Sequence, residues 1–282
     1  MEGRADLHMH SSHSDGVLTV GQLLARVKDA GLSIISITDH DNAAGVEEAV
    51  TAGKELGIEV IPGVELSASV GDQDIHILGY FFDPTDRKLQ EYLAVFRAER
   101  IQRAGRIVRK LNGLNIPLTL NAVLDRAGSG SVGRPHIASA LVEEGLTGSY
   151  HEAFLKYIGF GKPAYEKKYQ IAPRDAVELV ASAGGLSFIA HPGTLLDERT
   201  LLQLIGDGID GIEVIHPAHS PELTAHYRGI AEEYFLLTSG GSDFHGGKKN
   251  DHELLGRYTI TDRQIDTMRR RLTRTIPGHG GA

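Results

Sequence analysis

The sequence predicts an α/β barrel that carries a helical insertion, and three observations lead to this fold class. Short apolar runs rich in Ile and Val alternate with amphipathic stretches, an order typical of parallel strand and helix units. The chain has 282 residues, a length that one closed barrel can occupy. The alternation stops between about residues 86 and 169, where longer helical patterns replace it.

Six apolar runs are predicted to be strands buried on both faces, because they are continuous rather than alternating. In chain order these are 33–38, 59–64, 74–80, 185–190, 211–215 and 234–238. Four stretches with helical spacing lie between them, and several end at a Gly that can cap a helix. These are 20–30, 45–56, 173–183 and 198–205. The order of strand and helix predicts a parallel sheet, closed rather than open at this length.

The interruption is predicted to be a helical insertion of residues 89–167, with a barrel formed by residues 1–88 and 168–282. One long helix is expected at 89–114, with Arg at 97, 100, 103, 106 and 109. A solvated face is the preferred interpretation of this Arg series, with attraction of anionic substrates as the alternative. Shorter helices with Gly-rich breaks at 128–133 are expected at 118–157, and the Gly-rich tail at 277–282 is expected to fray.

The composition excludes several kinds of site. The chain has no Cys, so disulfides, thiolate nucleophiles and Cys-based metal sites are excluded, and nitrogen and oxygen must hold any metal. The formal net charge of −8 argues against binding of duplex nucleic acid. The sequence shows neither a secretory signal nor an apolar stretch of membrane-spanning length, so a soluble cytoplasmic protein without membrane partners is expected.

Histidines and carboxylates recur at the predicted ends of strands. The segments are Asp6-Leu7-His8-Met9-His10 followed by Ser14-Asp15-Gly16, then Thr38-Asp39-His40-Asp41, Gly63-Val64-Glu65, Asp74-Ile75-His76, Ala190-His191-Pro192 and Ser242-Asp243-Phe244-His245. Residues two apart on a strand point to the same face, so His8 and His10 can reach one ion. Barrel enzymes build their sites from the C-terminal ends of several strands, so these segments are expected to converge.

The segments supply more ligands than one ion can take, which implies two or three divalent ions. The candidates are His8, His10, Asp15, His40, Glu65, His76, His191, Asp243 and His245. Imidazole and carboxylate together suit Zn, Mn, Fe or Mg, and the nitrogen-rich positions favour the transition metals.

The series of motifs from Asp6 to His245 resembles the PHP (polymerase and histidinol phosphatase) family of the amidohydrolase-like barrels. The resemblance implies a distorted (β/α)7 TIM-like barrel and a trinuclear metal centre in which Glu65 bridges two ions. The implied ligand sets are His8, His10, Glu65 and Asp243 for one ion, Glu65, His76 and His191 for a second, and Asp15, His40 and His245 for a third.

Two segments of the insertion indicate which branch of the family the chain resembles. Gly-Arg-Pro-His-Ile-Ala at 133–138 and Gly-Lys-Pro-Ala-Tyr at 161–165 are similar to the branch that contains 3′,5′-nucleotide bisphosphate phosphatases and 5′-to-3′ exoribonucleases. The branch implies a phosphomonoester of a small nucleotide as substrate, extending to the ends of short single-stranded RNA. Arg134, Lys162 and His219 are expected to contact this substrate, because fixed cations neutralise phosphate.

Clustered ions lower the pKa of a shared water, and a metal-bridging hydroxide is expected to attack phosphorus in line. The residues expected to act in catalysis are Glu65, His191, Asp243 and His216. His216 and His219 are candidates to protonate the leaving group, and a structural, hydrogen-bonded histidine is the alternative for His216. Asp39 and Asp41 are expected to accept hydrogen bonds from ligand imidazoles. Lys248 and Lys249 are candidates for substrate contact or for a solvated loop.

Other functions stay open at this point. The rival enzymes are a phosphodiesterase for a cyclic sugar phosphate and a histidinol phosphatase, which would need acidic groups for a cationic substrate arm. A non-enzymatic metal-binding module would show lost ligands, and all nine are present. A serine triad built on Ser36, Ser67 or Ser242 would leave most of the ligands unexplained.

Overall fold

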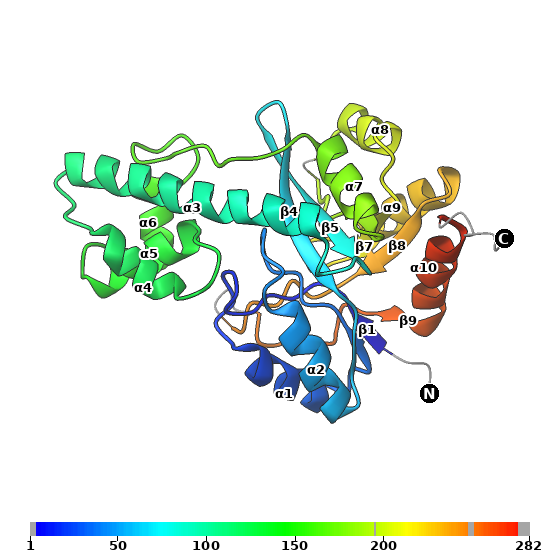
Figure 1. Cartoon of the computed structure of the whole chain (residues 1–282). Coiled ribbons are helices and arrows are strands. Elements are labelled where there is room, and N and C mark those ends of the chain that lie inside the picture. The colour runs from blue at the N-terminus through cyan, green and yellow to red at the C-terminus, as the bar shows by residue number, and fades with distance from the viewer. Residues whose placement is uncertain (1–3, 195, 248–250, 276–282) are drawn as a thin grey trace.

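The computed structural model describes residues 4–194, 196–247 and 251–275, so the predicted tail and Lys248 and Lys249 lie outside the described residues. The described strands form two sheets (Figure 1). The four-stranded sheet has the order β3 (Glu59–Val60), β2 (Ile34–Ile35), β1 (Arg4–Asp6) and β9 (Ile260–Thr261). The five-stranded sheet has the order β4 (Gly63–Val70), β5 (Gln73–Tyr80), β6 (Leu186–Ile189), β7 (Gly211–Ile215) and β8 (Leu237–Gly240).

The prediction of parallel strands is correct for four strand pairs and wrong for three. The pairs β1–β2, β2–β3, β6–β7 and β7–β8 are parallel. The pairs β4–β5, β5–β6 and β1–β9 are antiparallel. Only Gly71 and Asp72 connect β4 to β5, and Gly71 has a φ of 60°. A two-residue connection makes a hairpin, because a parallel pair needs a crossover of a dozen or more residues.

Backbone hydrogen bonds join the two sheets where several predicted motifs lie. The segment after β8 pairs with the segment after β1, since Leu7 N donates to Gly240 O (3.1 Å) and Asp243 N donates to His8 O (2.8 Å). The segment after β2 pairs with β4, since Asp41 N donates to Glu65 O (2.9 Å). These contacts fix the backbone of the motifs relative to one another.

The four predicted helices of the barrel region are present with bounds shifted by a residue or two. They are α1 (Val20–Asp29), α2 (Val46–Leu56), α7 (Pro173–Ser182) and α8 (Glu198–Gly206). Two further helices, α9 (Pro221–Glu233) and α10 (Asp262–Thr275), were not predicted. Each has a narrow apolar stripe: Tyr227 and Ala231 are buried on α9, and Ile265 and Met268 on α10. The strand predicted at 234–238 begins later, at Leu237, because α9 and its C-terminal turn occupy the first positions.

The insertion extends to one side of the sheets, with α3 running outward and the shorter helices beneath its far end (Figure 1). Its elements are α3 (Arg87–Gly113), α4 (Leu120–Ala127), α5 (Arg134–Glu143), α6 (Tyr150–Ala153) and the π-helical turn η1 (Phe154–Ile158). A hydrophobic cluster of its own, including Ile107, Leu111 and Ile137, fills the space between these helices. Among the described helices, none combines the length and apolar character that crossing a membrane requires.

Candidate metal centre

Glu65 on β4 lies at the centre of the predicted ligands and is fully buried. Its Oε2 lies 2.9 Å from His40 Nδ1. Its Oε1 lies 2.6 Å from His76 Nδ1 and 2.9 Å from His191 Nε2. The strand therefore holds one carboxylate between three imidazoles that come from three other segments of the chain.

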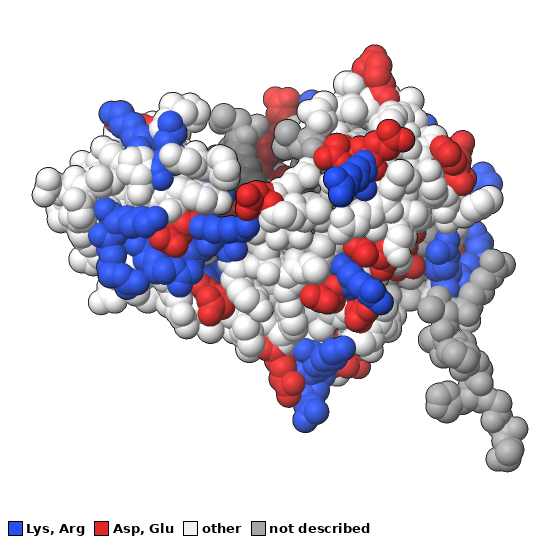
Figure 2. Space-filling view, turned by 90° about the horizontal axis from the view of Figure 1, so that it is seen from above, with Lys and Arg blue, Asp and Glu red and all other residues white. Residues whose placement is uncertain are grey.

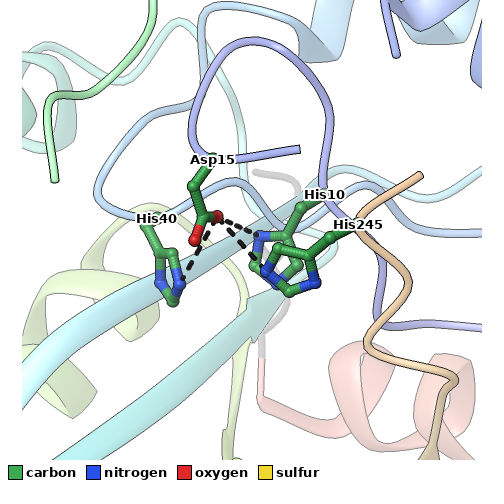
Figure 3. A group of neighbouring side chains, drawn as sticks. All are labelled: His10, Asp15, His40 and His245. Atoms are coloured by element: carbon green, nitrogen blue, oxygen red, sulfur yellow. Dashed lines mark ion pairs between the residues drawn. The ribbon is translucent and has the colours of Figure 1, made fainter. Parts of the chain in front are cut away.

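A second group forms around Asp15, whose carboxylate faces three imidazoles (Figure 3). Asp15 Oδ1 lies 3.3 Å from His245 Nε2, 3.8 Å from His40 Nε2 and 4.0 Å from His10 Nδ1. These four side chains come from three segments that are far apart in sequence, and together they could hold an ion.

A third group contains the two histidines that the spacing places on one face. Asp243 Oδ1 lies 3.1 Å from His10 Nε2 and 3.5 Å from His8 Nε2. Glu65 Oε2 lies 3.4 Å and 3.6 Å from the same two atoms. The structure thus brings all nine predicted side chains to one site.

The backbone at this site is strained. His191 and Asp243 have φ values of 27° and 50°, in a region that residues other than glycine rarely adopt. Asp41, next to His40, has a φ of 49°. Such strain persists only where the surroundings enforce it, and it concentrates at functional sites.

Several ligand-type atoms are buried without a hydrogen bond among the described residues. They are His8 Nε2, His10 Nε2, Asp15 Oδ1, His40 Nδ1, Glu65 Oε2 and His216 Nε2. A buried polar atom left without a partner costs free energy, and these atoms face one another rather than the apolar core. Five of the six belong to predicted ligands, so the residues fit a set of divalent ions.

The protonation states of His10, His76 and Glu65 favour ligation, whereas burial would lower the pKa of His8 and of His191 but neighbouring Glu213 and Glu65, respectively, raise it. Burial lowers the pKa of His10 to about 3, and burial followed by nearby Lys168 lowers the pKa of His76 to about 4. Both imidazoles are therefore neutral near pH 7 and keep a lone pair. Burial alone would raise the pKa of Glu65, but the surrounding imidazoles of His40, His76 and His8 hold it well below its usual range. An ionised carboxylate and neutral imidazoles are the forms that bind metals.

Glu213 on β7, which was not predicted to belong to the site, contacts two of the candidate ligand residues, His8 and His191. Its Oε1 lies 2.9 Å from His8 Nδ1, and its Oε2 accepts the backbone N–H of His191 at 2.7 Å. With Nδ1 bound to this carboxylate, His8 presents Nε2 to the cluster, which is how ligand histidines are usually oriented. A single acid inside the apolar run Gly-Ile-Glu-Val-Ile was the available signal.

The acceptor roles predicted for Asp39 and Asp41 are wrong. Asp39 accepts from Ser11 N (2.9 Å) and Ser11 Oγ (2.6 Å). Asp41 accepts from Ser67 N at 2.7 Å and Ser67 Oγ at 2.8 Å, and it pairs with Arg100 of α3. Both carboxylates fix the loops that carry the ligands, because backbone N–H groups and hydroxyls are nearer to them than the imidazoles.

The two histidines after β7 differ in what their ring nitrogens contact. His216 Nδ1 accepts the backbone N–H of Ala218 (3.0 Å), while Nε2 lies 3.7 Å from Asp243 Oδ2. His219 Nε2 accepts the N–H of Gly193 (3.0 Å), and Nδ1 lies 2.9 Å from Val214 O. Backbone groups occupy both nitrogens of His219, so the expected substrate contact does not fit it, whereas His216 faces the cluster.

Basic side chains line a cavity of about 250 Å³ beside the cluster. Arg134, at the start of α5, lines it together with His40 and His76, as the sequence analysis expected of a substrate contact. Lys168, which no sequence signal distinguished, lies 2.9 Å from His76 Nε2. Lys162 is exposed on a turn of the insertion and is not among the residues that line this cavity.

The prediction of a solvated Arg face on α3 is wrong for two of its residues. Arg103 is only 5% exposed and donates to Glu166 O at 2.9 and 2.7 Å. Arg100 pairs with the buried Asp41 and lines the same cavity. The first half of α3 packs against the barrel, so its inward Arg side chains reach the site instead of water.

Comparison with known proteins agrees with this site. The PHP domain model matches residues 6–186. A 5′-3′ exoribonuclease of Haemophilus influenzae is 37% identical over 87% of this chain and 91% of its own length. A 3′,5′-nucleoside bisphosphate phosphatase of Chromobacterium violaceum is 34% identical over 88% and 90%.

A phosphoribosyl 1,2-cyclic phosphate 1,2-diphosphodiesterase of Eggerthella lenta is 32% identical over 86% of this chain and 94% of its own length. Among solved structures, a protein of Bifidobacterium adolescentis assigned as a metal-dependent phosphoesterase superimposes with a TM-score of 0.87, at 33% identity, over 95% of this chain and 96% of its own. The chain belongs to the PHP domain family, and the predicted branch is confirmed.

Proposed function

We propose that this chain hydrolyses a phosphomonoester of a small nucleotide, such as a 3′,5′-nucleotide bisphosphate, at a centre of two or three divalent ions. The chain is a metal-dependent phosphoric ester hydrolase by family. The observation that carries the proposal is the convergence of nine histidine and carboxylate side chains on one site. Five of them, His8, His10, Asp15, His40 and Glu65, each bury one ligand atom without a hydrogen bond among the described residues.

The proposed ligand sets are those that the family resemblance implies, and the distances between the side chains support them. His8, His10, Glu65 and Asp243 would hold one ion, Glu65, His76 and His191 a second, and Asp15, His40 and His245 a third. Divalent ions at such a site supply Lewis acidity, since they lower the pKa of a bound water and neutralise charge on the phosphoryl group. Mn, Zn and Fe suit the nitrogen-rich groups, and Mg suits carboxylates.

His216 is proposed to stabilise the leaving oxygen by donating a hydrogen bond to it from Nε2. Because its Nδ1 accepts the N–H of Ala218, the neutral ring carries its hydrogen on Nε2, the nitrogen near Asp243. A nitrogen that carries hydrogen is a donor and not a metal ligand, which separates His216 from the nine ligands.

Arg134 is proposed to bind the substrate phosphate, with Lys168 adding positive charge on the same cavity wall. A guanidinium can donate two parallel hydrogen bonds to a phosphate, so Arg134 would also orient it. The position of Lys162 on the outer turn gives it no direct role at the reacting phosphate.

We propose that the two sheets form one distorted (β/α)7 barrel. Counting β3 and β4 as one strand broken at Ile61 and Pro62, the strands β1, β2, β3/β4 and β5–β8 make seven. The hydrogen bonds between the segments after β1 and β8, and between Asp41 and Glu65, support closure. The separate hydrophobic cluster of the helices supports a division into a barrel of 1–88 and 168–282 and a cap of 89–167.

A cyclic sugar-phosphate phosphodiesterase is the second candidate, because the relative from Eggerthella lenta is named for that reaction. A phosphate-release and product screen separates the two. Purified protein loaded with Mn is expected to release phosphate from a 3′,5′-nucleotide bisphosphate, and chelation of the metal is expected to stop the reaction. Turnover of a cyclic phosphate with no release from the bisphosphate would favour the second candidate and contradict the first.

A further inference from the structure

We propose that Phe160 and Tyr165 form a stacking platform for the second nucleotide of a single-stranded RNA whose 5′ end lies at the metal centre. This inference rests on the proposed function, since it extends the substrate from a mononucleotide to a short chain. The platform lies on the insertion, outside the nine ligand positions and outside the cavity beside them.

Phe160 lies exposed on a turn that a backbone hydrogen bond closes. Its side chain is 77% exposed, and its ring meets the ring of Tyr165 edge to face, with centroids 5.4 Å apart at 68°. The turn follows the π-helical η1, and Gly161 adopts a φ of 71° within it. Tyr165 N donates to Lys162 O at 2.9 Å, which closes the turn. An exposed ring fixed in this way offers one open face to a planar partner.

The platform is continuous with the proposed phosphate site. The guanidinium carbon of Arg134 lies 5.5 Å from the ring centroid of Tyr165 and 5.8 Å from that of Phe154. Arg134 also lines the cavity that contains His40 and His76. Moving outward from the metal centre, a ligand therefore meets a cation for phosphate, then Tyr165, and then Phe160. Alternation of cations and aromatic rings is the pattern of single-strand binding.

Positive charge lies beside the same turn, and Glu166 offsets part of it by pairing with Lys110. Lys162 is exposed two residues after Phe160, and Lys110 Nζ donates to Tyr165 O at 2.7 Å. Figure 2 shows Lys and Arg side chains gathered over the end of the molecule that the insertion forms. Paired bases cannot stack on a side chain without unstacking from their neighbours, so the platform favours a single strand over a duplex. The alternative role of an exposed aromatic residue is a contact with a second protein chain.

The test compares two substrates with one set of variants. Phe160→Ala is expected to lower kcat/KM roughly tenfold on a 5′-phosphorylated RNA trinucleotide, the loss typical of one stacking contact. It should leave kcat/KM on a 3′,5′-nucleotide bisphosphate unchanged. Phe160→Trp should retain the wild-type rate on both. Phe235→Ala is the matched control, because Phe235 is 84% exposed after α9, away from the insertion.

A direct readout of stacking accompanies the kinetics. A trinucleotide with 2-aminopurine at its second position should lose fluorescence on binding to the metal-free wild-type protein and lose less on binding to Phe160→Ala. Arg134→Ala should instead lower kcat/KM on both substrates. If the wild type fails on the bisphosphate, the proposed function is wrong. If it succeeds but Phe160→Ala affects both substrates equally or neither, only the platform is wrong. A wild-type dimer that Phe160→Ala separates, with unchanged kinetics, would assign the turn to a protein contact.

Discussion

Replacing Asp243 with Asn is expected to reduce phosphate release by at least about a thousandfold, because metal-based stabilisation of the transition state amounts to several kcal/mol. The carboxylate oxygens of Asp243 lie within 3.1 to 3.7 Å of His8, His10 and His216. Asn keeps the size of the side chain but removes its negative charge. The measurement is kcat on the nucleotide bisphosphate at saturating Mn, together with the bound metal per chain.

The control for this loss is Asp266→Asn on α10, where the carboxylate is 55% exposed and pairs with Arg269. An exposed pair contributes little to stability, so this variant should match the wild type in rate and metal content. Circular dichroism should show the same secondary structure in all three proteins. Wild-type turnover in folded Asp243→Asn would remove Asp243 from the reacting centre.

Replacing Arg100 with Met is expected to lower the free energy of unfolding by about 3 kcal/mol or more, because the substitution leaves a buried carboxylate without its cation. Asp41 is fully buried and its Oδ2 accepts from Arg100 Nε at 2.9 Å. The pair joins α3 to the loop that carries His40. Urea unfolding of both proteins with a chelator present measures the difference without a contribution from bound metal.

The difference in the free energy of unfolding between the wild type and Arg100→Met is also expected to depend on pH. Burial would raise the pKa of Asp41, but Arg100 and the N–H of Ser67 lower it below its usual value. A lowered pKa contributes stability that is present above the unfolded pKa and is lost as pH falls through the folded pKa. Without Arg100, burial dominates and the carboxyl becomes protonated on folding. The difference between wild type and variant should therefore be largest near pH 7 and shrink below about pH 4.

Arg109→Met provides the matched control, since Arg109 is exposed on the same helix. Its loss should change the free energy of unfolding by less than about 0.5 kcal/mol. Equal destabilisation by both substitutions would mean that Arg100 acts through helix propensity or general charge and not through Asp41.

The candidate metal site was predictable because its proposed ligands carry a local signal. His8 and His10 lie two apart after a strand, and Glu65, His191 and Asp243 each follow an apolar run. The ends of neighbouring strands meet in space, so strand positions alone were enough to bring these residues together. The supporting residues lacked such a signal. Lys168 lies in an exposed-looking charged run, and only the path of the insertion brings it to His76.

The fold was predictable where a helix or strand has a strong apolar period. It was less predictable where the structure depends on which strands pair and in which direction. The hydrophobic faces of α1 and α7 placed both helices within a residue or two. The antiparallel pairing of β4 and β5 depends on a two-residue connection that apolar patterns do not register. The Arg series of α3 looked solvated because its spacing marks one face but cannot show what that face contacts.

Anomalous diffraction from crystals grown with Mn would locate the bound ions directly. We expect two or three peaks among the nine side chains, each within about 2.0 to 2.3 Å of the nitrogen and oxygen atoms of one proposed ligand set. Two of the peaks should lie next to Glu65, since that carboxylate belongs to two of the proposed sets. Ions bound elsewhere, with His8, Glu65 and Asp243 remaining in contact only with one another, would show that these side chains do not form a metal centre.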